Sequence, residues 1–350
     1  MKIALVYSSK EGLLKEYAVR YGNNSPESEI PLDFFAEGDS PETIQAIIVA
    51  LENQGHQVTG IEADQLLNGR LIDYRPDLVF NIAEGLFGDF RESFVPMICE
   101  KYNIPYTGSD PLTLSLCLNK ARTKEFLSYY RIPNAPFRIF TPYSEIVLDD
   151  FEFPAIVKPV SEGSSKGIFN DSVVESIIEA KKRIKEKIAR YNQPVILEKF
   201  LKGEEYTVAV WGNGTEIEVL PIVAIQYSSL PAEAHPIYSY EAKWVWDTPE
   251  NPLEIFQCPA PLSILQRQKI EKVAYDAYQA MQIRDWCRID VRHDENDIPN
   301  ILELNPLPGI LPNPEDNSCF PKAARTAGYD YAEMLNKVVQ FTAKRYGIIS

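Results

Sequence analysis

The sequence predicts a protein of mixed α/β and α+β class, with a parallel sheet near the N-terminus and antiparallel strands after it. In residues 1–115, short apolar runs alternate with helical patterns, which is typical of a parallel sheet with crossover helices. From residue 116 the strands are separated by turns and charged helices. Near the C-terminus, two strand patterns flank an acidic turn, which indicates an antiparallel hairpin. We therefore expect three units, at 1–115, 116–200 and 201–350. Because no Pro/Gly/Ser-rich linker separates them, they should pack closely around a cleft.

The first unit contains three expected strands and one clear amphipathic helix. The strands are KIALVY (2–7), HQVTGIEA (56–63) and DLVFNI (77–82). Residues 40–55 carry apolar side chains three and four positions apart, and Ser40 is the expected helix N-cap. The loop NIAEGLFGDFRES (81–93) follows the third strand directly. Because ligands bind at the carboxyl ends of parallel strands, this loop is expected to face one.

The later units have their own order of elements. Helical patterns cover a basic segment at 118–130, a long charged segment at 172–191, and residues 266–281. Strand patterns occur at 153–159, 194–201, 204–225 and 286–305, and a Gly-Asn-Gly hairpin signal interrupts the third of these. A Gly/Ser-rich turn, SEGSSKGIF, occupies 161–169. The sequence shows no internal repeat.

Composition excludes several classes of protein. The chain has 350 residues, of which 45% are hydrophobic and 24% charged, close to globular averages and unlike disordered or collagen-like chains. Its apolar runs are far shorter than the roughly 18 residues that cross a bilayer. The N-terminus resembles a first strand more than a signal peptide, so we expect a cytoplasmic protein with no membrane partner.

The net charge and the numbers of histidines and cysteines argue against further classes of partner and metal site. The 35 basic and 50 acidic side chains give a net charge of −15, which disfavours a nucleic-acid partner. A chain this acidic must gather its lysines locally if it binds a polyanion. Three histidines are too few and too scattered for a histidine metal cluster, and five cysteines without CxxC spacing predict buried free thiols. The cysteines are Cys99, Cys117, Cys258, Cys287 and Cys319.

The strongest local signal is RID followed by LELNPLPG. Strand alternation places Arg288 and Asp290 on one face, and Glu303 and Asn305 on one face of the partner strand. If the strands pair, two carboxylates and an amide oxygen converge, a ligand set that suits magnesium. Arg288 beside them would face phosphate or carboxylate oxygens. The alternative is a solvated hairpin with ordinary surface charges.

Three weaker signals point to phosphate or nucleotide binding. Lys158 ends a buried strand and precedes the Gly/Ser turn, as in a phosphate cradle, although many such turns are only turns. Lys120 lies in a basic helix and, by itself, is best explained as an exposed lysine. Glu198 and Glu205 flank a turn and are suited to accept hydrogen bonds from an adenine amine or ribose hydroxyls. Their alternative is a solvated edge.

Taken in order, these segments resemble one enzyme family. LNKARTKEFL, IVKPVSEGSSKGI, ILEKFLKGEEYTVAVWGN, IYSYEAKW, RIDVR and ILELNPLPG resemble the ATP-grasp fold of the D-alanine–D-alanine ligase family, over about 230 residues. The segment NIAEGLFGDFRES with IPYTGSD is similar to the family's N-terminal, Rossmann-like (pre-ATP-grasp) domain. The resemblance implies an ATP-dependent carboxylate–amine ligase that acts on small amino-acid-like substrates. It also implies a homodimer formed through the N-terminal domain.

The resemblance implies a role for each matching residue. ATP phosphates would contact Lys120, Lys158 and Lys243, and the loop closing over them would carry Ser164 and Ser165. Adenine and ribose would be held by Glu198 and Glu205, with hinge backbone at Lys199, Phe200 and Leu201. Two magnesium ions, for which Mn²⁺ could substitute, would be bound by Asp290, Glu303 and Asn305. The oxyanion would be met by Arg288 and the N–H of Gly309, and the second substrate's carboxylate by Ser318.

The implied chemistry explains why these parts occur together. A carboxylate attacks the γ-phosphate of ATP, and the resulting acyl phosphate is attacked by an amine. Lysines and magnesium neutralise the meeting anions, and fixed donors meet the developing oxyanion. A lid keeps water from the acyl phosphate, and 161–168 and 228–247 are the lids we expect.

Departures from the family pattern all fall on the amino-acid side of the site. The usual N-terminal glutamate has no clear equivalent, although Glu11 and Glu16 are near. Glu84 stands at the usual histidine and Trp244 at the usual tyrosine, and a longer turn precedes Ser318. Since pocket walls set substrate choice, two alternatives stay open: the ligase joins two D-alanines, or it joins a different substrate pair. Glu84 is expected either to favour a cationic partner or to cap the following helix. The competing function is a nucleotide-binding scaffold without turnover.

Overall fold

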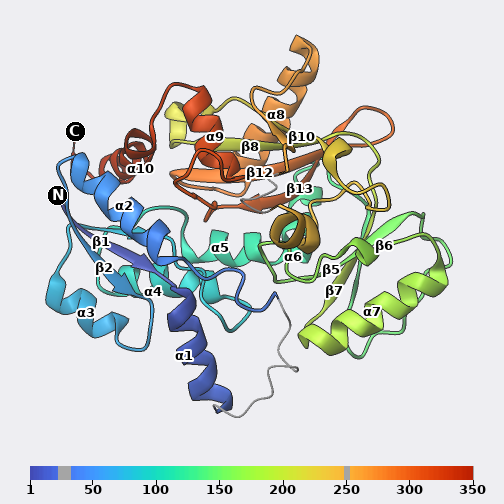
Figure 1. Ribbon diagram of the computed structural model, residues 1–350, viewed down its shortest axis with the longest axis horizontal. Helices are drawn as coiled ribbons and strands as arrows, with labels where there is room; N and C mark the ends of the chain where they lie inside the picture. The colour runs from blue at the N-terminus through green and yellow to red at the C-terminus, as the bar shows by residue number, and fades with distance from the viewer. Residues whose placement is uncertain (23–32, 248–252, 350) are drawn as a thin grey trace.

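The computed structural model describes residues 1–22, 33–247 and 253–349. Within these residues, the strands form three sheets, which Figure 1 shows as separate layers joined by helices. One sheet is parallel and the other two are antiparallel. The predicted mixed α/β and α+β class is therefore confirmed.

The parallel sheet is built from the three predicted N-terminal strands. Its order is β2 (Gln57–Glu62), β1 (Lys2–Tyr7), β3 (Leu78–Asn81). The surrounding helices are α1 (Lys10–Tyr21), α2 (Pro41–Asn53), α3 (Leu67–Tyr74), α4 (Phe94–Lys101) and α5 (Pro111–Leu118). Ser40 caps α2 as predicted, because its hydroxyl accepts from the N–H of Thr43 at 3.1 Å. The loop after β3 ends in a short 3₁₀ helix, η2 (Arg91–Ser93).

A four-stranded sheet follows α6 (Lys120–Tyr129). Its order is β4 (Phe137–Phe140), β7 (Val195–Lys199), β5 (Ala155–Pro159), β6 (Val173–Val174). The amphipathic helix α7 (Ile177–Tyr191) packs on β5 and β7 (Figure 1). The helix predicted over 172–191 was wrong at its start, because η3 (Asn170–Ser172) and β6 take up residues 170–174. Val173 and Val174 pair with β5 instead, and Ser176 caps the helix.

The largest sheet carries the predicted hairpin. Its order is β11 (Phe256–Gln257), β10 (Val223–Ile225), β8 (Glu205–Trp211), β12 (Trp286–His293), β13 (Pro299–Asn305), and β9 (Glu218–Val219) pairs with β8. Helix α8 (Ile264–Ala280) packs on this sheet. Three short helices lie in its connections: η4 (Gly214–Glu216), η5 (Tyr227–Ser229) and the π-helix η6 (Ala242–Trp246).

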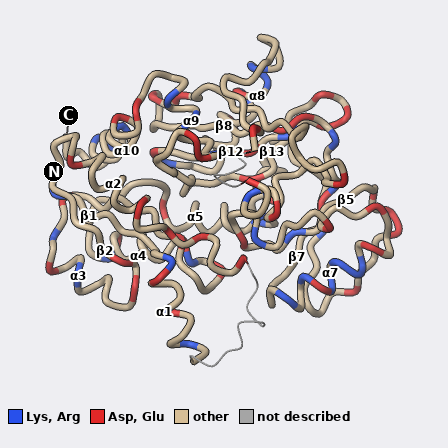
Figure 2. Tube along the Cα trace, in the orientation of Figure 1, with Lys and Arg blue, Asp and Glu red and all other residues tan. Residues whose placement is uncertain are grey.

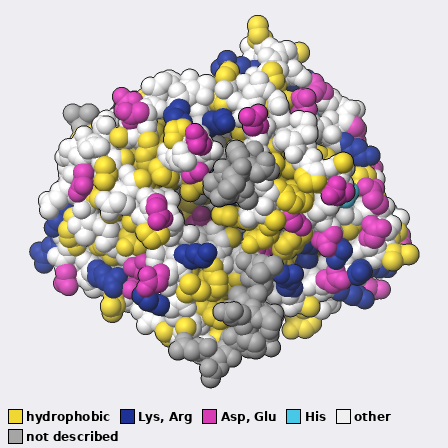
Figure 3. All heavy atoms as spheres, viewed as in Figure 1, with side chains coloured by type: hydrophobic (Ala, Val, Ile, Leu, Met, Phe, Trp, Pro, Cys, Tyr) yellow, Lys and Arg dark blue, Asp and Glu magenta, His cyan; other side chains and the backbone are white. Residues whose placement is uncertain are grey.

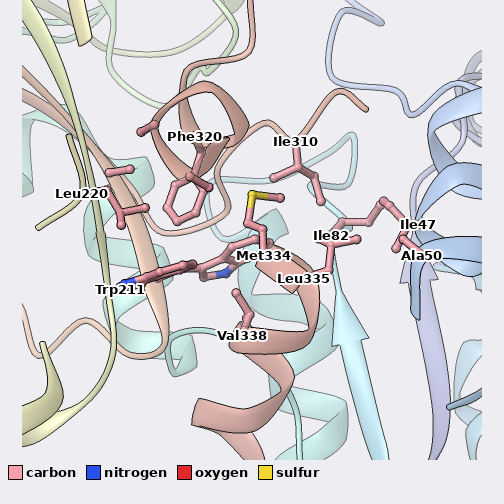
Figure 4. Close-up of a cluster of buried hydrophobic side chains, with 14 of the residues drawn as sticks. Ile47, Ala50, Ile82, Trp211, Leu220, Ile310, Phe320, Met334, Leu335 and Val338 are labelled. Carbon is pink, nitrogen blue, oxygen red and sulfur yellow. The ribbon is translucent and has the colours of Figure 1, made fainter. Parts of the chain in front are cut away.

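The C-terminal helices join this sheet to the N-terminal unit. Helix α9 (Cys319–Thr326) packs on β8, and α10 (Tyr331–Arg345) packs on α2. Figure 4 shows the shared core, in which Trp211 and Phe320 lie beside Met334, with Ile47 of α2 at the other side. Trp211 is fully buried, and its ring lies 4.9 Å from that of Tyr329. Helix α10 thus packs against the first unit. The three unit boundaries stay a prediction.

Charged side chains are distributed without one dominant basic patch on the face in view. Figure 2 shows acidic and basic residues alternating along α7, and Figure 3 shows both signs interspersed over the surface. Among the described residues, the helices are all too short or too polar to cross a bilayer.

Candidate active site

Almost all residues singled out in the sequence line one cavity of about 390 Å³. It is bordered by the loop after β3, by α6, by β5 and β7, and by the β12–β13 hairpin. Asn305 lines a smaller cavity that shares Glu84, Lys243, Arg288 and Glu303 with the large one. The site residues brought together at the main cavity are Glu84, Lys120, Lys158, Ser164, Ser165, Glu198, Lys199, Phe200, Leu201, Glu205, Lys243, Trp244, Arg288, Asp290, Glu303, Gly309 and Ser318.

The oxygen-rich end is set by the register of β12 and β13. Asp290 lies opposite Glu303, and Arg288 opposite Asn305, with a bulge immediately after Asp290. The Arg288 guanidinium donates to both oxygens of Asp290, at 3.2 and 3.0 Å, and Asn305 Nδ2 lies 3.4 Å from Asp290 Oδ2. The predicted pairing of the two strands is therefore confirmed, whereas the use of these three side chains as oxygen donors to a metal stays a prediction.

This donor set fits magnesium by its chemistry. Its oxygens are hard ligands of the kind Mg²⁺ takes beside phosphates. Within the described residues, no three acidic, histidine or cysteine side chains gather as a metal site. The carboxylates of Asp290 and Glu303 are paired with Arg288 and Lys120, respectively.

Lys120 is not the exposed helix lysine that it resembled in isolation. Its side chain is 5% exposed and its Nζ lies 2.6 Å from Glu303 Oε1, while it also donates to the carbonyl of Glu162. Burial acts to raise the pKa of Glu303, but Lys120 and Arg288 outweigh it and lower that pKa. The contact places a cation between the hairpin and the Gly/Ser loop, where a phosphate would need it.

Glu198 and Lys158 meet at the end of the cavity that is bordered by the four-stranded sheet. Lys158 Nζ lies 3.1 Å from Glu198 Oε2, and Lys124 Nζ lies 3.4 Å from the same oxygen. Burial acts to raise the pKa of Glu198, but these two lysines lower it, so the group is an ionised acceptor. Its Oε1 is buried and, within the described residues, has no hydrogen-bond partner. A ligand amine would satisfy it.

Glu205 is held by an arginine from the neighbouring strand. Arg292 Nη1 donates to Glu205 at 3.0 Å, and its guanidinium lies 4.6 Å from the centre of the Phe200 ring. Burial raises the pKa of Glu205 although Arg292 acts to lower it. The Lys199 ammonium pairs at 2.7 Å with each of Glu152 and Glu295 at the surface. We therefore expect its backbone, rather than its side chain, to act at the cavity.

The two predicted lid segments contact each other over the cavity. Ser164 and Ser165 have φ angles of 48° and 60°, a left-handed turn that exposes successive backbone groups. Ser165 Oγ donates to the carbonyl of Tyr238 at 2.9 Å, and the Trp244 indole N–H to the carbonyl of Ser164 at 3.4 Å. The N–H of Tyr240 also donates to the carbonyl of Ile168 at 2.8 Å, so three hydrogen bonds join loop 161–168 to segment 228–247 among the described residues.

The end of the cavity around Glu84 is acidic, because Glu37 and Asp39 line it as well. Glu84 has no hydrogen bond or ion pair among the described residues, and neither η2 nor α4 has a side-chain cap, so the helix-capping alternative was wrong. Burial, together with Glu37, Glu92 and Asp39, raises the pKa of Glu84. Burial and Arg288 lower the pKa of nearby Lys243.

Other residues at this end differ in part from expectation. Ser318 Oγ donates to the carbonyl of Gly309 at 3.1 Å and accepts from the N–H of Leu311 at 3.1 Å. Glu11 and Glu16 are exposed on α1 and do not line the cavity, whereas Glu37 and Asp39 do. These two carboxylates come from a segment in which the sequence offered no recognisable motif.

The cysteines are free, as predicted, but they are not uniformly buried. Cys99, Cys117 and Cys287 are buried, whereas Cys258 and Cys319 are half-buried. Cys319 lines the cavity, and burial raises the pKa of its thiol to about 12. A thiol with so high a pKa is protonated at neutral pH and is therefore a poor nucleophile.

Two cations at the site went unnoticed although they lie inside recognised motifs. Lys124 follows Lys120 by four residues, so both project from one side of α6. Arg292 follows Asp290 by two residues, so it shares the face of β12 that carries Arg288. Helical and strand periodicity were the signals that would have found them.

Comparisons with known proteins agree with this geometry. A family model described as the D-ala D-ala ligase C-terminus matches residues 132–340. An uncharacterized protein, y4sG of Sinorhizobium fredii, is 30% identical, over 99% of this chain and 98% of its own. The D-alanine–D-alanine ligase of Mannheimia succiniciproducens is 30% identical, over 94% and 98%. The crystal structure of D-alanine–D-alanine ligase from Bacillus anthracis complexed with ATP superimposes with a TM-score of 0.71 at 21% identity, covering 99% of each chain.

Proposed function

This chain belongs to the D-alanine–D-alanine ligase family and is an ATP-dependent ligase that forms an amide bond, and we propose that it joins an amino-acid carboxylate to an amine in this cavity. The observation that carries the proposal is the convergence of Lys120, Lys158 and Arg288 with Asp290 and Glu303 around one space. Cations beside paired oxygen donors are what phosphoryl transfer between two anions requires.

The nucleotide is ATP, bound between the four-stranded sheet and the hairpin. The unpartnered Oε1 of Glu198 accepts from the adenine amine, and Glu205, fixed by Arg292, accepts from ribose hydroxyls. When ATP binds, the Lys158 ammonium moves from Glu198 to the phosphates. Lys120 faces the phosphates from α6. The backbone N–H groups around Ser164 and Ser165 complete the phosphate cradle.

Magnesium, with Mn²⁺ as a substitute, would be held by Asp290, Glu303 and Asn305 as two ions, and would supply charge neutralisation at the phosphates. Arg288 then turns from Asp290 toward the reacting carbonyl. Its guanidinium and the N–H of Gly309 meet the oxyanion that develops as the amine attacks the acyl phosphate. Lys243 carries charge to the transferred phosphate from the 228–247 segment.

The substrate pair is set at the acidic end. Glu84 faces Glu37, Glu92 and Asp39, and mutual repulsion with burial disfavours its ionised form. A substrate ammonium would relieve that repulsion, so we propose that an ammonium group that does not react, such as the second amine of a diamino acid, lies beside Glu84. Ser318 receives the carboxylate of the second substrate, and Trp244 closes the wall above it.

The test is phosphate release from ATP with a panel of D- and L-amino acids, alone and in pairs, that includes diamino acids. Mass spectrometry identifies the amide. We expect release to require both a carboxylate and an amine donor, and to be fastest with a diamino acid. Glu84→Gln should remove that preference, whereas Glu16→Gln on exposed α1 should not. ATP binding without amide formation from any pair would instead favour the non-catalytic scaffold. A homodimer through the N-terminal domain is proposed on family grounds alone.

A further inference from the structure

Four charged side chains bridge the N-terminal unit and the Gly/Ser loop, and we call them the strap cluster: Glu37, Arg91, Glu162 and Lys166. Arg91 Nη2 lies 3.1 Å from each carboxylate oxygen of Glu37. Lys166 Nζ lies 3.1 Å from Glu37 and 2.8 Å from Glu162. Their side chains are between 2% and 13% exposed. Two anions and two cations therefore balance in a nearly dry environment.

The cluster stays ionised because its members stabilise one another. Burial acts to raise the pKa of Glu37, but Arg91 and Lys166 outweigh it and lower that pKa to about 2. Burial also opposes the charge of Arg91, yet Glu37 and Glu162 raise its pKa. Removing one partner of such a group leaves a buried charge uncompensated, which is strongly destabilising.

Two carboxylates of residues 33–37 also accept hydrogen bonds from the backbone of the Gly/Ser loop. Glu37 Oε1 accepts from the N–H of Gly163 at 3.0 Å, and Asp33 Oδ2 accepts from the N–H of Gly167 at 2.7 Å. Arg91 Nη1 donates to the carbonyl of Ser161 at 2.8 Å. Both glycines that bracket Ser164 and Ser165 are therefore tied to residues 33–37.

We infer that Glu37 is a positioning residue for ligation. It holds loop 161–168 closed over the cavity after the acyl phosphate has formed and before the amine attacks it. The inference rests on the proposed function. Among the described residues, the opposite side of the loop is held by three hydrogen bonds to segment 228–247: from Ser165 to Tyr238, from Trp244 to Ser164, and from the N–H of Tyr240 to the carbonyl of Ile168. The strap cluster holds the loop more strongly than these hydrogen bonds do, because its contacts are buried ion pairs.

If the strap cluster is weakened, loop 161–168 opens and water reaches the acyl phosphate. Water then attacks the acyl carbon, the bond from that carbon to the phosphate oxygen breaks, and carboxylate and inorganic phosphate are released. The net reaction is ATP and water to ADP and phosphate, with the carboxylate substrate regenerated. A closed loop therefore controls how many phosphates are released for each amide formed.

The experiment compares Glu37→Gln with the wild type by that ratio and by hydrogen exchange of the Gly163 and Gly167 amides. Glutamine keeps the shape and an acceptor but removes the charge. We expect the ratio to rise from one to about two or more, and both amides to exchange at least about tenfold faster. Arg345→Met is the matched control, because it breaks a buried ion pair with Asp285 remote from the loop. It should leave both readouts unchanged.

If Glu37→Gln does not fold, Asp33→Asn replaces it, since Asp33 forms no ion pair among the described residues. It should speed exchange at Gly167 and raise the ratio. A variant that folds with one phosphate per amide and wild-type exchange overturns the inference, as does an equal effect of Arg345→Met. Absence of any amide from the wild type would count against the proposed function instead, and the exchange rates would still decide whether Glu37 holds the loop.

Discussion

The ammonium nitrogen of Lys124 lies 3.4 Å from Oε2 of Glu198, and both side chains are 1% exposed. Lys158 approaches the same oxygen at 3.1 Å, so two cations share one anion. If Lys158 turns to a phosphate, Lys124 remains as the counter-ion of Glu198. We therefore expect Lys124 to keep the Glu198 carboxylate, the proposed acceptor for the adenine amine, ionised throughout the reaction.

Replacement of this counter-ion should weaken ATP binding. In Lys124→Met, Glu198 retains only Lys158, which cannot serve the carboxylate and the phosphates together. We expect the KM for ATP to rise about tenfold, the equivalent of about 1.4 kcal/mol, with a smaller change in kcat. Phosphate release at varied ATP measures both. Arg345→Met serves as the control for loss of a buried cation, and an unaltered KM in Lys124→Met would show that Lys158 alone suffices.

Glu303 should be indispensable for turnover but not for folding. Glu303→Gln removes a proposed magnesium ligand and the ion pair with Lys120, yet keeps the shape of the side chain. We expect a loss of kcat of about a hundredfold or more, as for removal of a group that stabilises transferring phosphate. Thermal unfolding followed by circular dichroism should stay cooperative. Glu295→Gln, at the surface beside Lys199, is the control that should retain activity. Near-normal turnover with magnesium in Glu303→Gln would remove this residue from the site.

The sequence was sufficient for those parts of the site that depend on local periodicity. The pairing of Asp290 with Glu303 follows from alternation along two strands joined by a short turn, and the structure confirms it. The start of α7 was mistaken because Val173 and Val174 fit either a helix or a strand, and only pairing with β5 decides between them.

The acidic end was less accessible to sequence reasoning. Glu37 and Asp33 reach Gly163 and Gly167 across more than a hundred residues of chain. No spacing rule connects positions so distant, because their contact depends on how two units pack. Glu84 was recognised as unusual, but its isolation from hydrogen-bond partners became visible only in the folded chain.

The aromatic core around Trp211 predicts how much the stability of the protein depends on this packing. Trp211 is fully buried, and its ring contacts those of Phe320, Tyr329 and Phe341. Figure 4 shows Trp211 and Phe320 in this core. Trp211→Ala should lower the free energy of unfolding by about 3–5 kcal/mol, because a large cavity cannot close around rigid rings. Urea unfolding measures this change. Trp244→Ala, at a side chain that is 45% exposed, should cost much less stability. Equal losses in the two variants would contradict the core assignment.

Asp39 should give the acidic end of the cavity a pH dependence near neutrality. Burial raises the pKa of its carboxyl to about 7; the N–H of Ser8 acts against this shift and Glu62 adds to it. Glu84 also faces it, so a substrate ammonium would enter a group of mutually repelling acids. We expect kcat/KM for a diamino substrate to rise as pH increases from 6 to 8, because Asp39 becomes ionised and attracts the cation. Asp39→Asn should flatten that rise, whereas Glu16→Gln should preserve it.

Stability should change with pH in the opposite direction. A carboxyl whose pKa is higher in the folded than in the unfolded protein binds its proton more tightly when folded. Its contribution is therefore complete below the unfolded pKa, whose usual value is 3.8, and is lost as pH rises through about 7. Relative to Asp39→Asn, the wild type should lose on the order of 3 kcal/mol of unfolding free energy between pH 4 and 8. Urea unfolding at several pH values measures the difference. A difference that stays constant across this range would mean that Asp39 is ionised throughout, and the rise in kcat/KM would then need another titrating group.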